Sequence, residues 1–266
     1  MRMSSCTLAA ALLLPLAATA QTAAPAASAA AGSMQVPAYV THAMNDSARA
    51  ADKKDDTRRQ MAVVMTFTGA KPGDKVMELL PGSGYWTRVF SQVVKPGGHV
   101  YTVWPDSTKP DSKSWANWAK LVKTAHYSDV TMLREDMNKP HAPTAVDIVF
   151  TSENYHDLHD PYWGPDKQPV DIAAFNKAIF DALKPGGVFI VTDHMAPAGS
   201  GISDTNTLHR IDPETVKREV EAAGFVFDGS SDALINSKDP LDIKVFEPSI
   251  RGHTSQFIYR FKKPAK

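Results

Sequence analysis

Histidine and carboxylate side chains are concentrated in residues 153–160, whose sequence is Glu-Asn-Tyr-His-Asp-Leu-His-Asp. His156 stands in the middle of this segment. A neutral imidazole whose pKa lies near its usual value can take the proton of an attacking oxygen or nitrogen. We therefore predict that His156 is a general base. Asp193 and His194 are adjacent farther along the chain, and we predict that this pair is catalytic as well, because a carboxylate can orient or activate an imidazole.

The same segment allows a metal site as an alternative. His156 and His159 are three residues apart, so they would share one face of a helical turn. Imidazole nitrogens and carboxylate oxygens are ligands that divalent metals accept. However, His-x-x-His without a cysteine or a defined third ligand is a pattern of low specificity, so the sequence assigns no metal ligand. In the metal interpretation, further candidate ligands are Asp157, Asp160, Asp193, His194 and His209. In a third interpretation, the histidines only form hydrogen bonds within a loop.

A second candidate site lies in residues 76–87. A short apolar run there contains an acidic residue, Glu78, and is followed by a glycine-containing turn and the start of a predicted helix. This strand–loop–helix order is typical of nucleotide-binding α/β proteins, in which a ligand lies against backbone that has no side chain. We expect ligand contacts from Glu78, Pro81, Gly82, Ser83 and Gly84.

The elements that would position both sites alternate between strand and helix. The pattern predicts strands at 76–80, 99–104, 130–133, 146–151, 188–192, 225–227 and 256–261, and helices at 46–67, 85–94, 114–125, 172–183 and 214–223. Such alternation favours a doubly wound, mostly parallel seven-stranded sheet with helices on both faces and an antiparallel edge strand. Ligands of these sheets bind beyond the carboxyl ends of the strands, where both candidate sites would meet.

On these segments the chain resembles the class I S-adenosylmethionine-dependent methyltransferases. The resemblance covers residues 46–266 and is carried by three segments, 76–87, 146–149 and 183–188. The chain is similar in particular to exported methyltransferase-like proteins of bacteria, because it contains the sequences Glu-Leu-Leu-Pro-Gly and Asn-Tyr-His-Asp. The resemblance implies a Rossmann-like methyltransferase fold and S-adenosylmethionine as cofactor.

In that family the acidic residue and the glycines of the first loop hold the methionine part of the cofactor, and an acidic residue after the third strand faces the adenine. Asp136 matches the latter position, and Met137 follows it. Two positions depart from the pattern. Leu80 replaces the first glycine of the loop, and Trp104, 20 residues after Gly84, replaces the acidic residue that accepts the ribose hydroxyls. An indole can stack on the cofactor but accepts no hydrogen bond.

The resemblance implies methyl transfer from S-adenosylmethionine to a small-molecule acceptor. Two alternatives stay open: a ligand-binding protein that kept the fold without catalysis, and a metal-dependent enzyme that uses the histidine-rich segment. The sequence does not favour a serine hydrolase, because Ser83 lacks the Gly-x-Ser-x-Gly spacing. With 29 basic and 29 acidic residues, the charge balance gives no support for a nucleic-acid partner.

The first residues are typical of a secretory signal peptide. Arg2 precedes an apolar run at 8–17, and a small-residue cleavage motif ends at residue 20. Residues 21–33 consist largely of Ala, Pro, Ser and Thr, which predicts a disordered linker. We therefore expect a single methyltransferase-like domain at 34–266, a periplasmic or secreted location, and no membrane anchor after cleavage. Cys6 is the only cysteine, so the mature chain would contain no disulfide.

Overall fold

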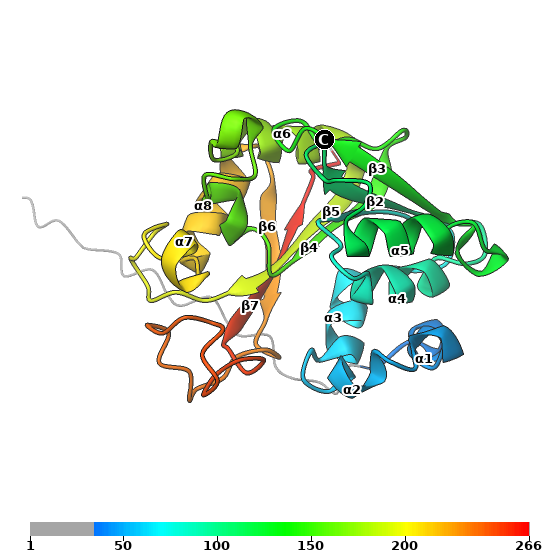
Figure 1. Ribbon diagram of the computed structural model, residues 1–266, viewed down its shortest axis with the longest axis horizontal. Helices are drawn as coiled ribbons and strands as arrows, with labels where there is room; N and C mark the ends of the chain where they lie inside the picture. Colours follow the sequence, from blue (N-terminus) through cyan, green and yellow to red (C-terminus); the bar gives the residue numbers. More distant parts are fainter. Residues whose placement is uncertain (1–34, 266) are drawn as a thin grey trace, which may run out of the picture. The chain divides into compact units, whose positions relative to one another are not determined.

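A computed structural model describes residues 35–265 of the chain. The predicted signal peptide and linker lie outside the described residues and stay predictions. The described part forms a seven-stranded sheet in the order β3-β2-β1-β4-β5-β7-β6 (Figure 1). Its strands are β1 (Lys75–Leu79), β2 (His99–Pro105), β3 (Val130–Glu135), β4 (Val146–Ser152), β5 (Leu183–His194), β6 (Val226–Ser231) and β7 (Gln256–Lys262).

The strand directions agree with the predicted topology. Strands β3, β2, β1, β4 and β5 pair in parallel, whereas β7 is antiparallel to β5 on one side and to the edge strand β6 on the other. Strand order reverses between β1 and β4, because the chain first builds the sheet outward to β3 and then returns to the other side of β1. This reversal is the point at which doubly wound sheets bind their ligands.

Helices cover both faces of the sheet, as the sequence predicts (Figure 1). They are α1 (Ala38–Met44), α2 (Lys53–Asp56), α3 (Met61–Thr68), α4 (Tyr85–Val93), α5 (Lys113–Leu121), α6 (Ile172–Ala182), α7 (Thr205–Leu208) and α8 (Pro213–Ala222). Strand β4 shows how the sheet serves two cores, because side chains alternate between its faces. Ile148 and Phe150 pack in the cluster with α1, α3, α4 and α5, while Val149 packs with α6 and α8.

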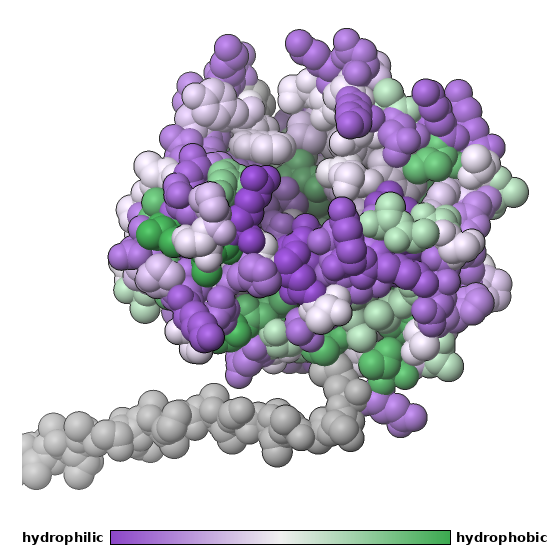
Figure 2. Space-filling view, turned by 60° about the horizontal axis from the view of Figure 1, so that its bottom comes forward, coloured by the Kyte–Doolittle hydropathy of each residue, from purple (hydrophilic) through white to green (hydrophobic). Residues whose placement is uncertain are grey.

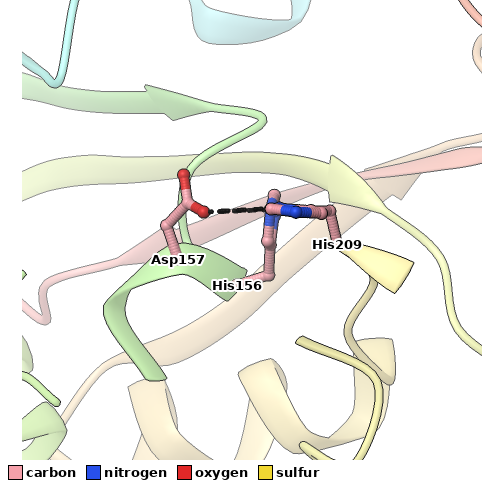
Figure 3. A group of neighbouring side chains, drawn as sticks. All are labelled: His156, Asp157 and His209. Carbon is pink, nitrogen blue, oxygen red and sulfur yellow. Dashed lines mark ion pairs between the residues drawn. The ribbon is translucent and has the colours of Figure 1, made fainter. Parts of the chain in front are cut away.

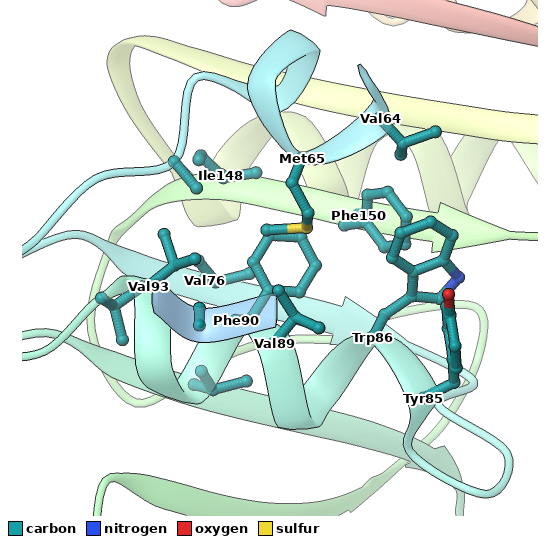
Figure 4. Close-up of a cluster of buried hydrophobic side chains, with 14 of the residues drawn as sticks. Val64, Met65, Val76, Tyr85, Trp86, Val89, Phe90, Val93, Ile148 and Phe150 are labelled. Atoms are coloured by element: carbon teal, nitrogen blue, oxygen red, sulfur yellow. The ribbon is translucent and has the colours of Figure 1, made fainter. Parts of the chain in front are cut away.

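Aromatic contacts hold α4 against the sheet. The rings of Trp86 and Phe90 each meet Phe150 of β4 edge to face, with centroids 5.2 and 5.1 Å apart, and Val64 and Met65 of α3 close the cluster (Figure 4). Edge-to-face pairs of this kind add about 0.5–1.5 kcal/mol to the burial of the rings themselves. The start of α4, and with it the loop that follows β1, is therefore held in one position.

Two local predictions differ from the structure. The helix expected at 46–67 is broken, because Gln60 adopts a left-handed conformation (φ 46°) between α2 and α3. The break lets α2 turn toward α4, where Asp56 accepts hydrogen bonds from Arg49 (2.7 Å) and from the Tyr85 hydroxyl (2.7 Å). Residues 184–187, which separate the predicted helix at 172–183 from the predicted strand at 188–192, instead belong to β5, because the backbone of Gly186 and Gly187 pairs with Lys263.

Polar and charged side chains cover most of the face in Figure 2, with smaller hydrophobic areas between them. This distribution is ordinary for a domain whose large apolar side chains are buried. Within residues 35–265, no helix combines the length and the apolar character needed to cross a bilayer.

A buried ion pair ties the long connection between β6 and β7 to the end of β5. The guanidinium of Arg210 donates two hydrogen bonds to Asp239, each of 2.9 Å, and one of 2.8 Å to the carbonyl oxygen of Met195. Both side chains of the pair are completely buried. The segment that contains residues 205–211 is thereby fixed beside the carboxyl end of the sheet.

We expect Asp239→Asn to lower the free energy of unfolding by about 3–5 kcal/mol, because the substitution leaves the Arg210 charge buried and without its counterion. Urea denaturation followed by circular dichroism measures this change. Asp228→Asn is the control, because Asp228 pairs with Arg260 on the surface, where both side chains are about one-third exposed and such pairs contribute about 0–1 kcal/mol. Equal losses in the two variants would contradict a structural role for the buried pair.

Candidate functional site

The loops after β1, β2 and β4 meet at the carboxyl end of the sheet and line a cavity of about 750 Å³. A segment distant in sequence, near the end of α7, completes the wall. Residues from all four regions line this main cavity: Leu80, Gly82, Trp104, Pro105, Ser107, Thr108, Ser112, Lys113, Ser114, Asn154, Asp157, Asp160, Tyr162, Trp163, Asn206 and His209. The two predicted sites therefore do open onto one space.

A smaller cavity of about 170 Å³ lies beside the main one and shares Leu80, Gly82 and Asn154 with it. Its walls include Glu78 and the loop residues Pro81 and Ser83. The structure thus gathers most of the predicted first-loop residues around one hollow, next to the space that His209 and Asp157 border.

The loop after β1 has an unusual backbone. Leu80 adopts φ 53°, in the left-handed region that favours glycine, and Gly82 follows with φ 55°. The N–H of Leu80 donates to the carbonyl oxygen of Val103 at 2.9 Å, so the loop stays joined to β2. A non-glycine residue in this region costs about 1–3 kcal/mol. Leu80 therefore adopts a backbone conformation that favours glycine, and its side chain is part of the wall of both cavities.

Glu78 is buried at the end of β1 and faces the smaller cavity. Burial raises the pKa of its carboxyl group to about 8, although the Thr87 hydroxyl, which donates to Oε2 at 2.5 Å, opposes the rise. A carboxyl group with this pKa is mostly protonated at neutral pH. It can become charged when a cationic group binds next to it. Sequence reasoning missed Thr87, whose only signal was its place on the first turn of α4.

Of the other three predicted cofactor contacts, Trp104 lies on a cavity wall, whereas Asp136 and Met137 do not. Trp104 lines the main cavity, and its indole N–H donates to the Thr102 hydroxyl at 3.3 Å. Asp136 accepts a hydrogen bond of 2.9 Å from the backbone N–H of Asn138, and Met137 is buried in the core on the α6 and α8 side. Among the described residues that line the two cavities, neither Asp136 nor Met137 is present.

Gly84 is likewise absent from the walls of both cavities. A Cβ atom added there would lie 2.1 Å from the ring of Trp118, whereas one added at Gly82 would meet nothing within 4 Å. The indole N–H of Trp118 donates to the carbonyl oxygen of Ser83 at 3.2 Å. Gly84 therefore serves packing, and Gly82 leaves room for a ligand.

His156 and Asp193 form a buried pair, whereas the sequence predicts a pair of Asp193 with His194. Asp193 accepts two hydrogen bonds of 2.8 Å from His156, one from the imidazole Nδ1 and one from the backbone N–H. Burial alone would lower the pKa of His156, but the charges of Asp193, Asp157 and Asp160 raise it to about 9, and His156 in turn lowers the pKa of Asp193. At neutral pH this imidazole is therefore mostly protonated in the free protein, and its predicted role as a general base stays a prediction.

The other ring nitrogen of His156 faces Asp157, which lines the main cavity, whereas His156 itself does not line it. Nε2 lies 3.3 Å from Oδ1 of Asp157, and the same oxygen lies 3.7 Å from Nδ1 of His209 (Figure 3). The rings of His156 and His209 are perpendicular, with centroids 5.4 Å apart. We call His156, Asp157 and His209 the histidine cluster. Burial raises the pKa of Asp157 to about 6, and both burial and the charge of His156 lower the pKa of His209.

Two predicted histidines do not join this cluster. Nε2 of His159 lies 3.3 Å from Glu219, so His156 and His159 do not act together as a His-x-x-His pair. His194 is hydrogen-bonded to the Thr254 hydroxyl at 2.7 Å and does not line the described cavities, and burial lowers its pKa. Its predicted catalytic role stays a prediction.

Asn154 connects two loops of the site, although the sequence assigns it no role. Its side-chain amide donates to the carbonyl oxygen of Leu80 at 3.4 Å and lines both cavities. The residue thus joins the loop after β4 to the loop after β1. Its position directly after the end of β4, within the Asn-Tyr-His-Asp sequence, was the available signal.

We expect Gly84→Ala to lower the free energy of unfolding by about 3 kcal/mol, because the added methyl group overlaps Trp118 and the backbone has φ 80°. Gly82→Ala is the matched control, with a loss of about 1 kcal/mol, since its backbone is also left-handed but its surroundings are open. Urea denaturation of the two variants measures the difference. Equal destabilisation would mean that the indole does not restrict Gly84.

Comparison with known proteins gives relatives over part of the chain. A protein-L-isoaspartate O-methyltransferase of Ignicoccus hospitalis is 33% identical over 133 residues, which cover 49% of this chain and 52% of that protein. One of Methanosarcina mazei is 34% identical over 131 residues, or 48% of this chain and 42% of that protein. The chain thus spans about half the length of the curated relatives it matches. No protein-family model matches it.

Solved structures match over more of the chain. A SAM-dependent methyltransferase from Aquifex aeolicus has a TM-score of 0.51 at 16% identity, over 84% of this chain and 96% of its own. The [4+2]-cyclase SpnF has a TM-score of 0.54 at 17% identity, over 82% of each chain. With the observed strand order, these likenesses confirm the predicted Rossmann-like methyltransferase fold.

Proposed function

We propose that this chain, which has the class I methyltransferase fold, transfers a methyl group from S-adenosylmethionine to a small-molecule acceptor. The observation that carries the proposal is that the cavity beside the first loop adjoins the cavity beside the histidine cluster. Gly82, in the loop after β1, lines both cavities; the smaller one is also lined by Glu78 and the main one by Asp157 and His209. A methyl donor and an acceptor could therefore meet at the boundary between these cavities.

The residues around the smaller cavity fit the cofactor chemically. Glu78 offers a carboxylate to the ammonium group of the methionine part, and Gly82 lets that part lie against the backbone. Trp104 offers an aromatic surface in the main cavity but no acceptor for ribose hydroxyls. When bound, S-adenosylmethionine supplies an electrophilic methyl group on its sulfonium. The contribution of this chain would be to hold the acceptor in line with that group, because correct positioning alone can remove a large part of the barrier to a bimolecular transfer.

Two classes of acceptor are compared. The main cavity of about 750 Å³ is within the usual range for small-molecule sites, which supports a small acceptor. Relatives named protein-L-isoaspartate O-methyltransferase support an isoaspartyl carboxylate as the second candidate. Transfer of labelled methyl groups to an isoaspartyl peptide, compared with transfer to the small-molecule ultrafiltrate of a cell extract, distinguishes them.

The direct test is calorimetric titration of residues 34–266 with S-adenosylmethionine and S-adenosylhomocysteine. We expect both to bind, and we expect Gly82→Asp to lower affinity at least about tenfold, because a carboxylate there would fill the space against which the ligand lies. Gly97→Asp is the control, since Gly97 also has a left-handed backbone and open surroundings but lies in the turn before β2. Absence of wild-type binding at millimolar ligand would reject the transferase and leave a protein that has the fold without the cofactor.

Cofactor binding should release a proton from Glu78. Since its pKa is about 8, the group is protonated in about nine of ten free molecules at pH 7, and an adjacent ammonium group would favour the charged form. Calorimetry in buffers of different ionisation enthalpy should show release of nearly one proton at pH 7, falling toward zero above pH 9. Glu78→Gln should abolish this release.

The same raised pKa has a consequence for stability without ligand. The native state holds a proton that the unfolded state loses above about pH 4.5, so the free energy of unfolding should fall as pH rises from about 4.5 to about 8. Glu78→Gln should reduce this fall. An unchanged pH profile in the variant would mean that Glu78 is not the group that titrates.

A further inference from the structure

We propose that the histidine cluster, His156, Asp157 and His209, binds a divalent transition-metal ion at the wall of the main cavity. Two of its donors come from one 3₁₀ turn after β4 (His156–His159), and the third comes from the residue that ends α7. Figure 3 shows the three side chains directed toward one another. The ion is of the class that two imidazoles and one carboxylate bind, such as Zn²⁺, Co²⁺ or Fe²⁺.

The spacing of the donor atoms suits such an ion. One ligand atom from each residue lies within 4.8 Å of the other two. Oδ1 of Asp157 lies 3.3 Å from Nε2 of His156 and 3.7 Å from Nδ1 of His209. Metal–ligand bonds of about 2.0–2.2 Å place neighbouring donors roughly 3–3.5 Å apart, so small side-chain movements suffice.

The second nitrogen of His156 has the partner that metal-binding histidines usually have. Its Nδ1 is hydrogen-bonded to the completely buried carboxylate of Asp193, which also accepts the backbone N–H of His156. This carboxylate fixes the orientation of the ring and directs Nε2 toward Asp157. In metal sites, a carboxylate in this position selects the tautomer that leaves the other nitrogen free to bind the ion.

An independent observation also points to a missing ligand. Oδ1 of Asp160 is buried and, within residues 35–265, has no hydrogen-bond partner, although Asp160 lines the main cavity with Asp157 and His209. An unpartnered buried carboxylate oxygen is costly. A cation, or a polar group carried on that cation, would satisfy it.

The position of the site gives the ion a role that rests on the proposed function. Asp157 and His209 of the cluster line the main cavity, as Gly82 and Trp104 do. An ion held by the cluster would bind an acceptor oxygen or nitrogen within this cavity. The acceptor class would then be a molecule with a metal-binding heteroatom next to the atom that is methylated.

The test uses residues 34–266 without an affinity tag, stripped of metal and titrated with Zn²⁺ and Co²⁺, with Mg²⁺ for comparison. We expect one equivalent of Zn²⁺ or Co²⁺ to bind, with visible absorption bands for Co²⁺, and little binding of Mg²⁺. Asp157→Asn and His209→Gln should each weaken binding at least about tenfold. Near-ultraviolet circular dichroism establishes that the variants are folded.

His159→Gln is the matched control, because His159 lies three residues after His156 but faces Glu219. It should bind the metals like the wild type. Absence of wild-type binding, or wild-type affinity in both cluster variants, would overturn the proposal and identify the cluster as a hydrogen-bonding group only. Titration with S-adenosylmethionine in the presence of a chelator is carried out separately, so failure of the metal site and failure of the cofactor site give different results.

Discussion

The buried carboxylate of Asp193 is the contact on which the arrangement of the site depends. It lies at the end of β5 and accepts two hydrogen bonds from His156, which belongs to the loop after β4. Neighbouring parallel strands deliver their carboxyl ends to the same edge, but they do not determine how the following loops fold. The two hydrogen bonds to Asp193 fix the conformation of the loop after β4. They place Asp157 and Asp160 on the cavity wall and leave Asn154 to reach the loop after β1.

Much of the fold could be predicted from local patterns. Each strand from β1 to β5 is an apolar run bounded by turn residues, and the helices between them carry apolar stripes, so alternation alone indicated a doubly wound sheet. The broken helix at 46–67 could not be predicted in this way. The break lies at Gln60, and the arrangement that it allows is held by Asp56, which accepts hydrogen bonds from Arg49 and from Tyr85 in a different helix. Tertiary contacts of this kind override local propensity.

The candidate site was predictable to a smaller extent. His156 and Asp193 follow the ends of adjacent strands, so topology brings them together, and the sequence indicated both. His209 comes to the same place by another route, because the ion pair of Arg210 and Asp239 fixes its neighbour beside β5. The spacing of residues in the sequence does not indicate an ion pair between positions as far apart as Arg210 and Asp239. The position of Asp136 was also not predictable from its match to the family pattern. Asp136 follows β3, which ends away from the point where strand order reverses, and it lies outside the two cavities.

The fold leaves the chemistry open, since a methyltransferase of Aquifex aeolicus and a [4+2]-cyclase share it with this chain. The site residues of this chain come from distant parts of the sequence. The first loop is complete within the first third of the sequence, whereas His209 is held by a clamp whose other half, Asp239, lies near the last strand. During synthesis or refolding, the ligand loop could form well before the histidine cluster is assembled. A chain stopped before residue 239 would contain every residue of the first loop and of the histidine cluster, but it would lack β7 and the counterion of Arg210.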